Sequence, residues 1–98
     1  MKAIIKKPGE YPGHIEDIPN TLEALQKLVD GYIETITLPI LPPVIIICDE
    51  EGVMNNRPYN CRVDGVRFLG TIVAVGADIE DFTDCPLTLE GWKELIGT

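Results

Sequence analysis

Side chains suited to ligand binding gather directly after the most apolar run of this sequence. The run at 44–48 ends in three consecutive acids, Gly52 follows, and two asparagines and an arginine occupy 55–57. A guanidinium can hold a phosphate or a carboxylate through two parallel hydrogen bonds, and amide side chains both donate and accept. This arrangement indicates a site for an anionic or heterocyclic ligand at the end of a core strand.

The candidate site extends beyond the arginine, because a tyrosine ring two positions later could stack on a base. The candidate ligand-binding residues are Glu51, Asn55, Asn56, Arg57 and Tyr59. A structural interpretation of the same residues stays open. In that interpretation the asparagines bond their own backbone in a turn, and Arg57 neutralises Glu50 or Glu51.

Catalytic chemistry is not indicated. The sequence lacks a phosphate-binding Gly-Lys-Ser/Thr loop, a nucleophile elbow and a His-Glu-x-x-His motif. His14 is the only histidine, and the acids at 49–51 do not alternate around a glycine as calcium ligands do. Cys48, Cys61 and Cys85 are widely spaced, and acidic surroundings favour the thiol over the reactive thiolate. We therefore predict no catalytic residues, no metal and no cofactor.

Length and charge restrict the classes of partner. A chain of 98 residues can build one useful core, so we expect a single domain over 1–98. The net charge of −8 and the scattered lysines and arginines argue against direct nucleic-acid binding. Neither a signal peptide nor a membrane-spanning run is present, so we expect a soluble, cytoplasmic protein with no membrane partner.

Local patterns predict five strands and two helices. The predicted strands cover 1–7, 14–18, 32–38, 44–48 and 71–75. The first helix is expected to begin at an Asn20 N-cap with Glu23 as the capping-box acid, and Gly31 suits a left-handed residue after its last turn. Thr88 is expected to cap a short C-terminal helix. The weak pattern at 53–69 predicts one long loop.

The order of these elements predicts the fold class. Strands in runs with few helices favour an α+β fold with a mostly antiparallel sheet. We expect a curled sheet of about five strands with one helix packed on a face, in a β-grasp-like ββαββ…β order, and the short helix at the C-terminus. The continuous apolar run at 44–48 is typical of a strand buried on both faces.

Several segments together resemble the DUF3846 family of small proteins of unknown function. The resemblance covers nearly the whole chain, and the segment that enters the first helix is its most specific part. It rests on 1–4 followed by a Lys-x-Pro-Gly turn, on 20–26, on Val29-x-Gly31 with 32–34, on 49–52, on Asn56-Arg57, and on Gly70-Thr71 before a strand that ends at Gly76. It implies an accessory protein of bacteriophages, plasmids or Gram-positive bacteria, and it implies no catalytic residue.

Three functions are compatible with these patterns. The first is a non-enzymatic binding protein of a phage or mobile element that sequesters a nucleotide-like molecule as counter-defence, with a homo-oligomer as one way to complete its pocket. The alternative is an acidic protein–protein module that inhibits or regulates a basic host factor, as antirestriction proteins do. A small hydrolase that acts through its carboxylates ranks last, because no partner residues for the acids are evident.

Overall fold

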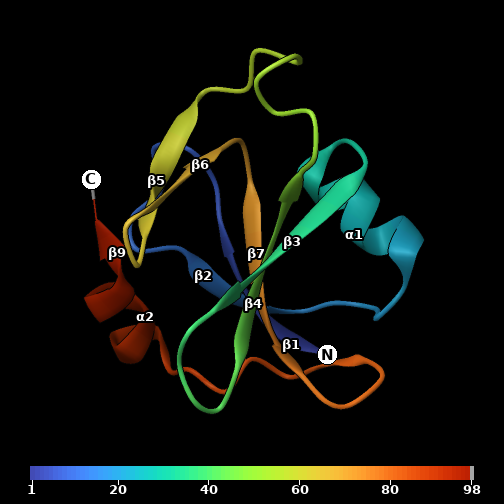
Figure 1. The fold of residues 1–98 in the computed structure, drawn as a ribbon, viewed down its shortest axis with the longest axis vertical. Helices are drawn as coiled ribbons and strands as arrows, with labels where there is room; N and C mark the ends of the chain where they lie inside the picture. The colour runs from blue at the N-terminus through green and yellow to red at the C-terminus, as the bar shows by residue number, and fades with distance from the viewer. Residues whose placement is uncertain (98) are drawn as a thin grey trace.

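The computed structural model describes residues 1–97 and shows an α+β fold built around a main sheet (Figure 1). The strand order in this sheet is β2-β1-β7-β4-β3, with β8 paired to the end of β7. Each pairing among the described strands is antiparallel. The strands of this sheet are β1 (Lys2–Lys6), β2 (His14–Asp17), β3 (Ile33–Leu38), β4 (Val44–Asp49), β7 (Ile72–Ala77) and β8 (Phe82–Thr83). The predicted fold class and all five predicted strands are confirmed.

The main sheet is covered on both faces, and its strands alternate between two cores. On β4, Ile46 belongs to one hydrophobic cluster and its neighbour Ile47 to the other. The first cluster lies toward the C-terminal helix, and the second lies under the first helix. This double burial explains why the run at 44–48 is continuously apolar.

The helix α1 (Leu22–Val29) packs on the second core through Leu25 and Val29. Its N-cap is Thr21, whose side chain accepts a hydrogen bond from the backbone of Ala24 at 3.1 Å. The predicted Asn20 cap is therefore wrong by one residue. Asn20 instead donates to Asp81 and to the carbonyl of Phe82, which ties the start of the helix to a distant loop.

The end of α1 also differs from the prediction. The left-handed residue is Asp30, with φ of 59°, and not Gly31. Aspartate enters this region more readily than most residues, and here the Asp30 side chain accepts a hydrogen bond from Arg57. Gly31 is needed for a different reason: a Cβ at this position would lie 2.6 Å from a carboxylate oxygen of Asp49.

Residues 53–69 do not form the single long loop that the sequence indicates. A turn at 50–56 leads into β5 (Tyr59–Val63), and β6 (Val66–Leu69) returns beside it. Asp64 and Gly65 join them, both with positive φ, as the tightest hairpin turns require. With β9 (Ile96–Gly97) these strands form a separate small sheet in the order β6-β5-β9.

The C-terminal helix α2 (Leu89–Leu95) begins at the predicted cap, since the Thr88 side chain accepts from the backbone of Gly91. Trp92 is fully buried in the first core, and its indole Nε1 donates to the carbonyl of Pro12 at 2.7 Å. The small sheet and α2 thus cover the face of the main sheet opposite α1. The N-terminal loop is fastened to this layer.

Candidate functional site

The acidic turn after β4 is organised around one buried carboxylate, that of Asp49. Its Oδ1 accepts from the backbone N–H of Glu51 at 2.9 Å, and its Oδ2 accepts from Asn55 Nδ2 at 3.0 Å and from Arg57 Nε at 3.1 Å. Arg57 continues to Asp30, where it bonds the carboxylate at 3.1 Å and the backbone carbonyl. The turn is therefore a hydrogen-bonded clasp between the end of β4 and the end of α1.

The electrostatics of this clasp are those of a structural ion pair. Burial alone would raise the pKa of Asp49, but the hydrogen bonds from Asn55, from the Glu51 N–H and from Arg57 outweigh it and lower the pKa. Three donors thus hold the carboxylate ionised. Because the carboxylate is buried and three of its roughly four acceptor sites are already filled, it is poorly placed to receive a ligand.

The structure brings only some of the predicted site residues together. Asn55 and Arg57 converge on Asp49, and Glu51 contributes its backbone N–H. Asn56 is exposed in a left-handed conformation, with φ of 54°, and Tyr59 lies on β5. The open structural interpretation is closer to this geometry, although Arg57 pairs with Asp49 and Asp30 instead of Glu50 or Glu51.

A shallow cleft of about 220 Å³ borders the clasp. Its ionisable lining is dominated by the carboxylates of Glu34, Asp49, Glu50 and Glu51, with Arg67 as the cationic member. Such a lining repels an anion at neutral pH. The predicted anion site is therefore poorly placed on this side of the molecule.

A larger cleft, of about 560 Å³, lies between β1, the loop after it and the small sheet. Its lining includes Lys6, Tyr11, Tyr59, Asn60 and Cys61. Lys6 is only 4% exposed. Within residues 1–97, no carboxylate lies within the 4.0 Å ion-pair distance of its ammonium group.

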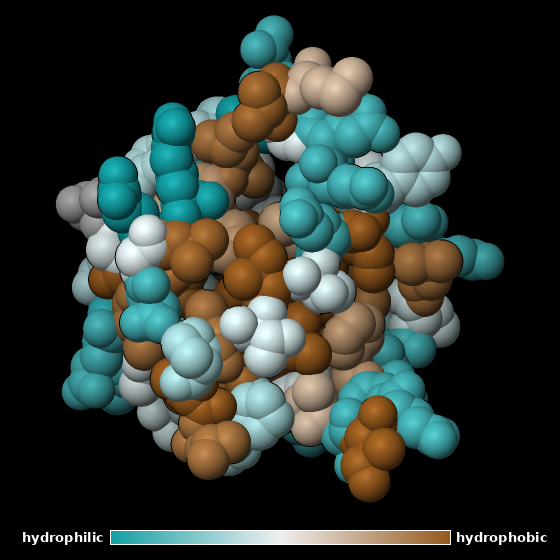
Figure 2. All heavy atoms as spheres, in the orientation of Figure 1, coloured by the Kyte–Doolittle hydropathy of each residue, from teal (hydrophilic) through white to brown (hydrophobic). Residues whose placement is uncertain are grey.

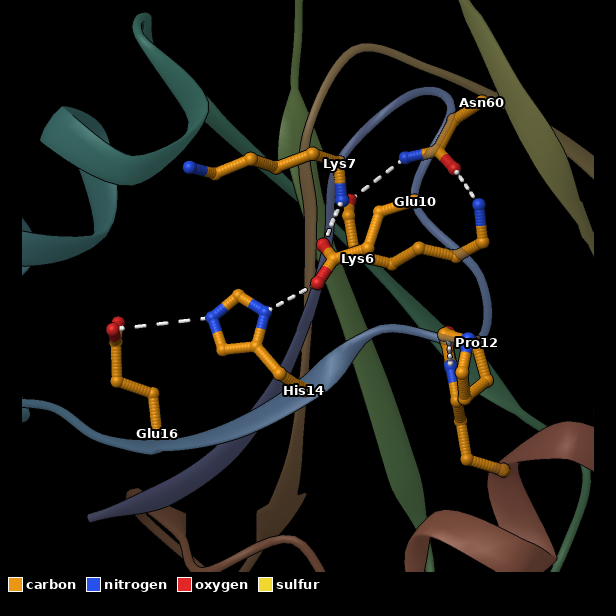
Figure 3. A network of polar contacts seen from close by, with 8 residues as sticks. Lys6, Lys7, Glu10, Pro12, His14, Glu16 and Asn60 are labelled. Atoms are coloured by element: carbon orange, nitrogen blue, oxygen red, sulfur yellow. Dashed lines mark hydrogen bonds and ion pairs between the residues drawn. The ribbon is translucent and has the colours of Figure 1, made fainter.

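The ammonium of Lys6 has one protein acceptor, Asn60 Oδ1 at 2.7 Å (Figure 3). A lysine ammonium carries three N–H donors, so this contact uses only one of them in a residue that lines the cleft. Burying a cation without a counter-charge is costly. An anion seated in the cleft would supply both the charge and the missing acceptors.

Asn60 reaches this position because of an irregularity in β5. The register between β5 and β6 shifts between Tyr59 and Cys61, as at a β-bulge. A bulge re-aims a side chain, and here it turns the amide of Asn60 inward. Asn60 Nδ2 donates to the carbonyls of Lys6 at 2.8 Å and Gly70 at 2.7 Å, so this one side chain joins the two sheets.

Aromatic rings border the same cleft. Tyr11 is 69% exposed and Tyr59 is 40% exposed, so both rings are accessible to a planar ligand. The guanidinium of Arg67 lies 5.3 Å from the centroid of the Tyr59 ring, a cation–π distance.

Burial raises the pKa of Cys61, although the charge of Lys6 partly opposes this, so the thiol stays protonated.

The single histidine is paired with two acids, Glu10 and Glu16, and Glu10 itself lines the cleft (Figure 3). His14 Nδ1 lies 2.7 Å from Glu10 Oε2, and its Nε2 lies 3.9 Å from Glu16. Burial alone would raise the pKa of Glu10, but hydrogen bonds from the Lys7 backbone and from His14 outweigh it and lower the pKa. This pair fixes the loop after β1, and with it one wall of the cleft.

The sequence analysis did not identify Lys6, and it did not predict the contact between Lys6 and Asn60. They lie 54 positions apart, and each sits in a stretch whose pattern suggests a surface residue. A usable signal existed in the first strand. Alternation in 1–7 places Lys6 on the same face as the buried Ile4, where a lysine is unusual.

These features define a small α+β protein with a cleft beside a buried lysine, between two antiparallel sheets. The model of the family described as a domain of unknown function (DUF3846) matches residues 1–96. The chain belongs to the DUF3846 family, as its sequence segments suggested. No curated protein and no solved structure matches it. Across residues 1–97, the helices are too short and too polar to cross a lipid bilayer.

Proposed function

We propose that this protein is a non-enzymatic binding protein that holds a small, anionic, nucleotide-like ligand in the cleft at Lys6. The observation that carries the proposal is a cation that is 96% buried, has one neutral acceptor and faces a cleft of about 560 Å³. That volume lies within the usual range of small-molecule pockets.

The aromatic border of the cleft supports the nucleotide-like character of the ligand. Phosphate or carboxylate oxygens would accept from the Lys6 ammonium, and a base would stack on Tyr59 or Tyr11. Tyr59 is the one predicted site residue that lines this cleft. The proposed biological setting is sequestration of such a molecule by a phage or mobile element, in line with the kind of protein that the family resemblance implies.

Replacing Lys6 with methionine is expected to weaken ligand binding at least about tenfold, because a charge-assisted hydrogen bond contributes roughly 1.5–3 kcal/mol. Isothermal titration against cyclic nucleotides, linear nucleotides and ADP-ribose measures the affinity. Lys7→Met is the matched control, since it removes the same charge from an exposed neighbour. Absence of heat with every member of the panel, or equal affinity in K6M and K7M, would refute the proposal.

A second candidate function, docking on a basic protein, is favoured by one surface loop. Ile79 is 96% exposed and is flanked by Asp78, Glu80 and Asp81. An apolar side chain within an acidic rim suits the centre of a small interface with a cationic partner.

Under this second function, the double variant Glu80→Gln/Asp81→Asn should lose a partner that the unmodified chain retains from host lysate at low salt. The charge pairs of such an interface are exposed, so about 0.5 M salt should release the same partner. Glu50→Gln/Glu51→Gln is the control for net charge. Equal retention by both double variants would contradict docking at this loop.

A further inference from the structure

The outer edge of β3 is open to a further strand. β3 is the last strand of the main sheet, and it pairs with β4 alone. Its register with β4 runs without a shift from Ile33 to Leu38. In Figure 1 the strand runs across the front of the molecule, and no other strand covers it.

The hydrogen bond that precedes β3 shows which of its backbone groups face outward. The N–H of Glu50 donates to the carbonyl of Tyr32 at 2.8 Å, so residues 32 and 50 form a hydrogen-bonded pair in the β3–β4 ladder. Such pairs alternate along an antiparallel ladder. The backbone groups of Glu34 and Ile36 therefore bond β4.

The backbone groups of the intervening residues point away from β4. These residues are Ile33, Thr35 and Thr37. Within residues 1–97, none of their N–H or C=O groups has a partner in another turn, loop or side chain. Each offers one donor and one acceptor at the edge of the sheet.

We propose that β3 pairs antiparallel with β3 of a second copy of this chain, with Thr35 opposite Thr35 on the twofold axis. In this register Ile33 lies opposite Thr37 of the second copy, so the outward groups of each strand meet those of the other. A register whose twofold axis passed between two residues would instead oppose outward groups to groups already bonded to β4. Among the registers that match outward groups with each other, the one centred on Thr35 pairs all three outward residues of each strand.

The side chains of β3 also fit this pairing. Thr35 opposite Thr35, and Ile33 opposite Thr37, are pairs of β-branched residues, which stabilise antiparallel ladders. Glu34, the one charged residue of the strand, lies opposite Ile36 of the second copy, so like charges are not directly opposed. Figure 2 shows apolar and weakly polar residues at the centre of this face, with hydrophilic residues mostly around them.

β3 lacks the features that normally prevent an edge strand from pairing with a strand of another chain. Proteins protect free edges with proline, lysine or a bulge, and β3 has none of these. The opposite edge of the sheet is different, because β2 carries His14, Glu16 and Asp17 in four residues. Self-pairing of β2 would bring acids together, which leaves β3 as the edge suited to a second copy.

The net charge of −8 on each copy opposes association, and salt screens this repulsion. Dimerisation through β3 should therefore strengthen as salt rises from about 0.05 to 0.5 M. Sedimentation equilibrium of the full chain measures the mass and its dependence on concentration. A species of 10.8 kDa at every concentration up to about 1 mM would overturn the proposal.

Thr35→Pro tests the register. Proline removes an N–H that points away from β4, so the fold should remain, whereas dimerisation should weaken at least about tenfold. Thr35→Val is the matched control, because it keeps the N–H and the branched shape. Equal dimerisation of T35P and T35V would overturn the proposed pairing.

Amide hydrogen exchange on the unmodified chain tests the register without relying on a variant that folds. In the dimer, Thr35 and Ile36 should both be protected. On dilution to the monomer, Thr35 should lose protection while Ile36, bonded to β4, keeps it. Fast exchange of Thr35 at concentrations where the dimer prevails would contradict the pairing.

Discussion

Replacing Asn60 with alanine should lower the free energy of unfolding by about 4 kcal/mol. The amide is 8% exposed, donates to the carbonyls of Lys6 and Gly70, and accepts from the Lys6 ammonium. Each buried polar group left without a partner costs roughly 1–3 kcal/mol, and Asn60 serves three. Since a domain of this size is stabilised by roughly 5–15 kcal/mol, the loss is a large part of the total.

Asn60→Asp separates two roles of this side chain. A carboxylate would neutralise Lys6, but it would also face the carbonyls of Lys6 and Gly70 with an oxygen instead of a donor. If joining the two sheets is the main role, N60D should be destabilised by at least about 2 kcal/mol despite the new ion pair. If neutralising Lys6 matters more, N60D should match or exceed the original chain.

Urea denaturation followed by tryptophan fluorescence measures both variants, because Trp92 is buried in the core that the small sheet helps to enclose. Asn56→Gly is the control, since Asn56 is exposed, its side chain makes no hydrogen bond within residues 1–97, and glycine can keep the left-handed backbone of this position. N60A with the stability of N56G would show that the link between the sheets is unimportant.

The parts of the fold that sequence predicted are those whose signals are local. The run at 44–48 identified a strand buried on both faces, and the residues after Thr88 identified the second helix. The N-cap of α1 was misplaced because Asn20 and Thr21 are both good caps. The choice between them depends on Asp81 and Phe82, which hold Asn20 from about 60 residues away.

The hairpin of β5 and β6 was not predicted because its bulge removes the signal. Asn60 and Cys61 are adjacent and both buried, which breaks the alternation of a regular strand. The Asp64-Gly65 pair was recognised only as a loop signal, although it closes the hairpin. Asn60 can be buried because its amide donates to the carbonyls of Lys6 and Gly70. The pattern around Asn60 does not reveal these acceptors.

The segment that the sequence indicated as a candidate site forms a hydrogen-bonded network in the structure. Clustered acids, asparagines and an arginine did indicate a polar network, and Asn55 and Arg57 do act together. Sequence could not show that Asp49 turns inward while Glu50 and Glu51 do not. Nor could it show that Asp30, at the end of α1, receives the far side of Arg57.

Replacing Asp49 with asparagine should lower the free energy of unfolding by about 3 kcal/mol, because the clasp depends on its carboxylate. Each partner of the carboxylate is a donor, namely the Glu51 N–H, Asn55 Nδ2 and Arg57 Nε. An amide NH₂ in place of one oxygen would face a donor. Breaking a buried ion pair costs roughly 3–5 kcal/mol, and the lower end applies because Arg57 remains partly open to water.

Glu51→Gln is the matched control, since it removes one negative charge two residues away and leaves the backbone N–H to Asp49 in place. Its stability should change by no more than about 0.5 kcal/mol. Urea denaturation at pH 7 compares the two variants with the original chain. A loss in E51Q as large as that in D49N would assign the effect to net charge instead of the clasp.

The pH dependence of this difference follows from the lowered pKa of Asp49. A carboxylate whose pKa is lower in the folded state stabilises the fold fully above its unfolded value, about 3.9, and the contribution is lost as pH falls through the folded value. The gap between the original chain and D49N should therefore be constant from about pH 5 to 7 and should narrow below about pH 4. A gap that persisted unchanged at pH 2 would mean that ionisation of Asp49 does not stabilise the clasp.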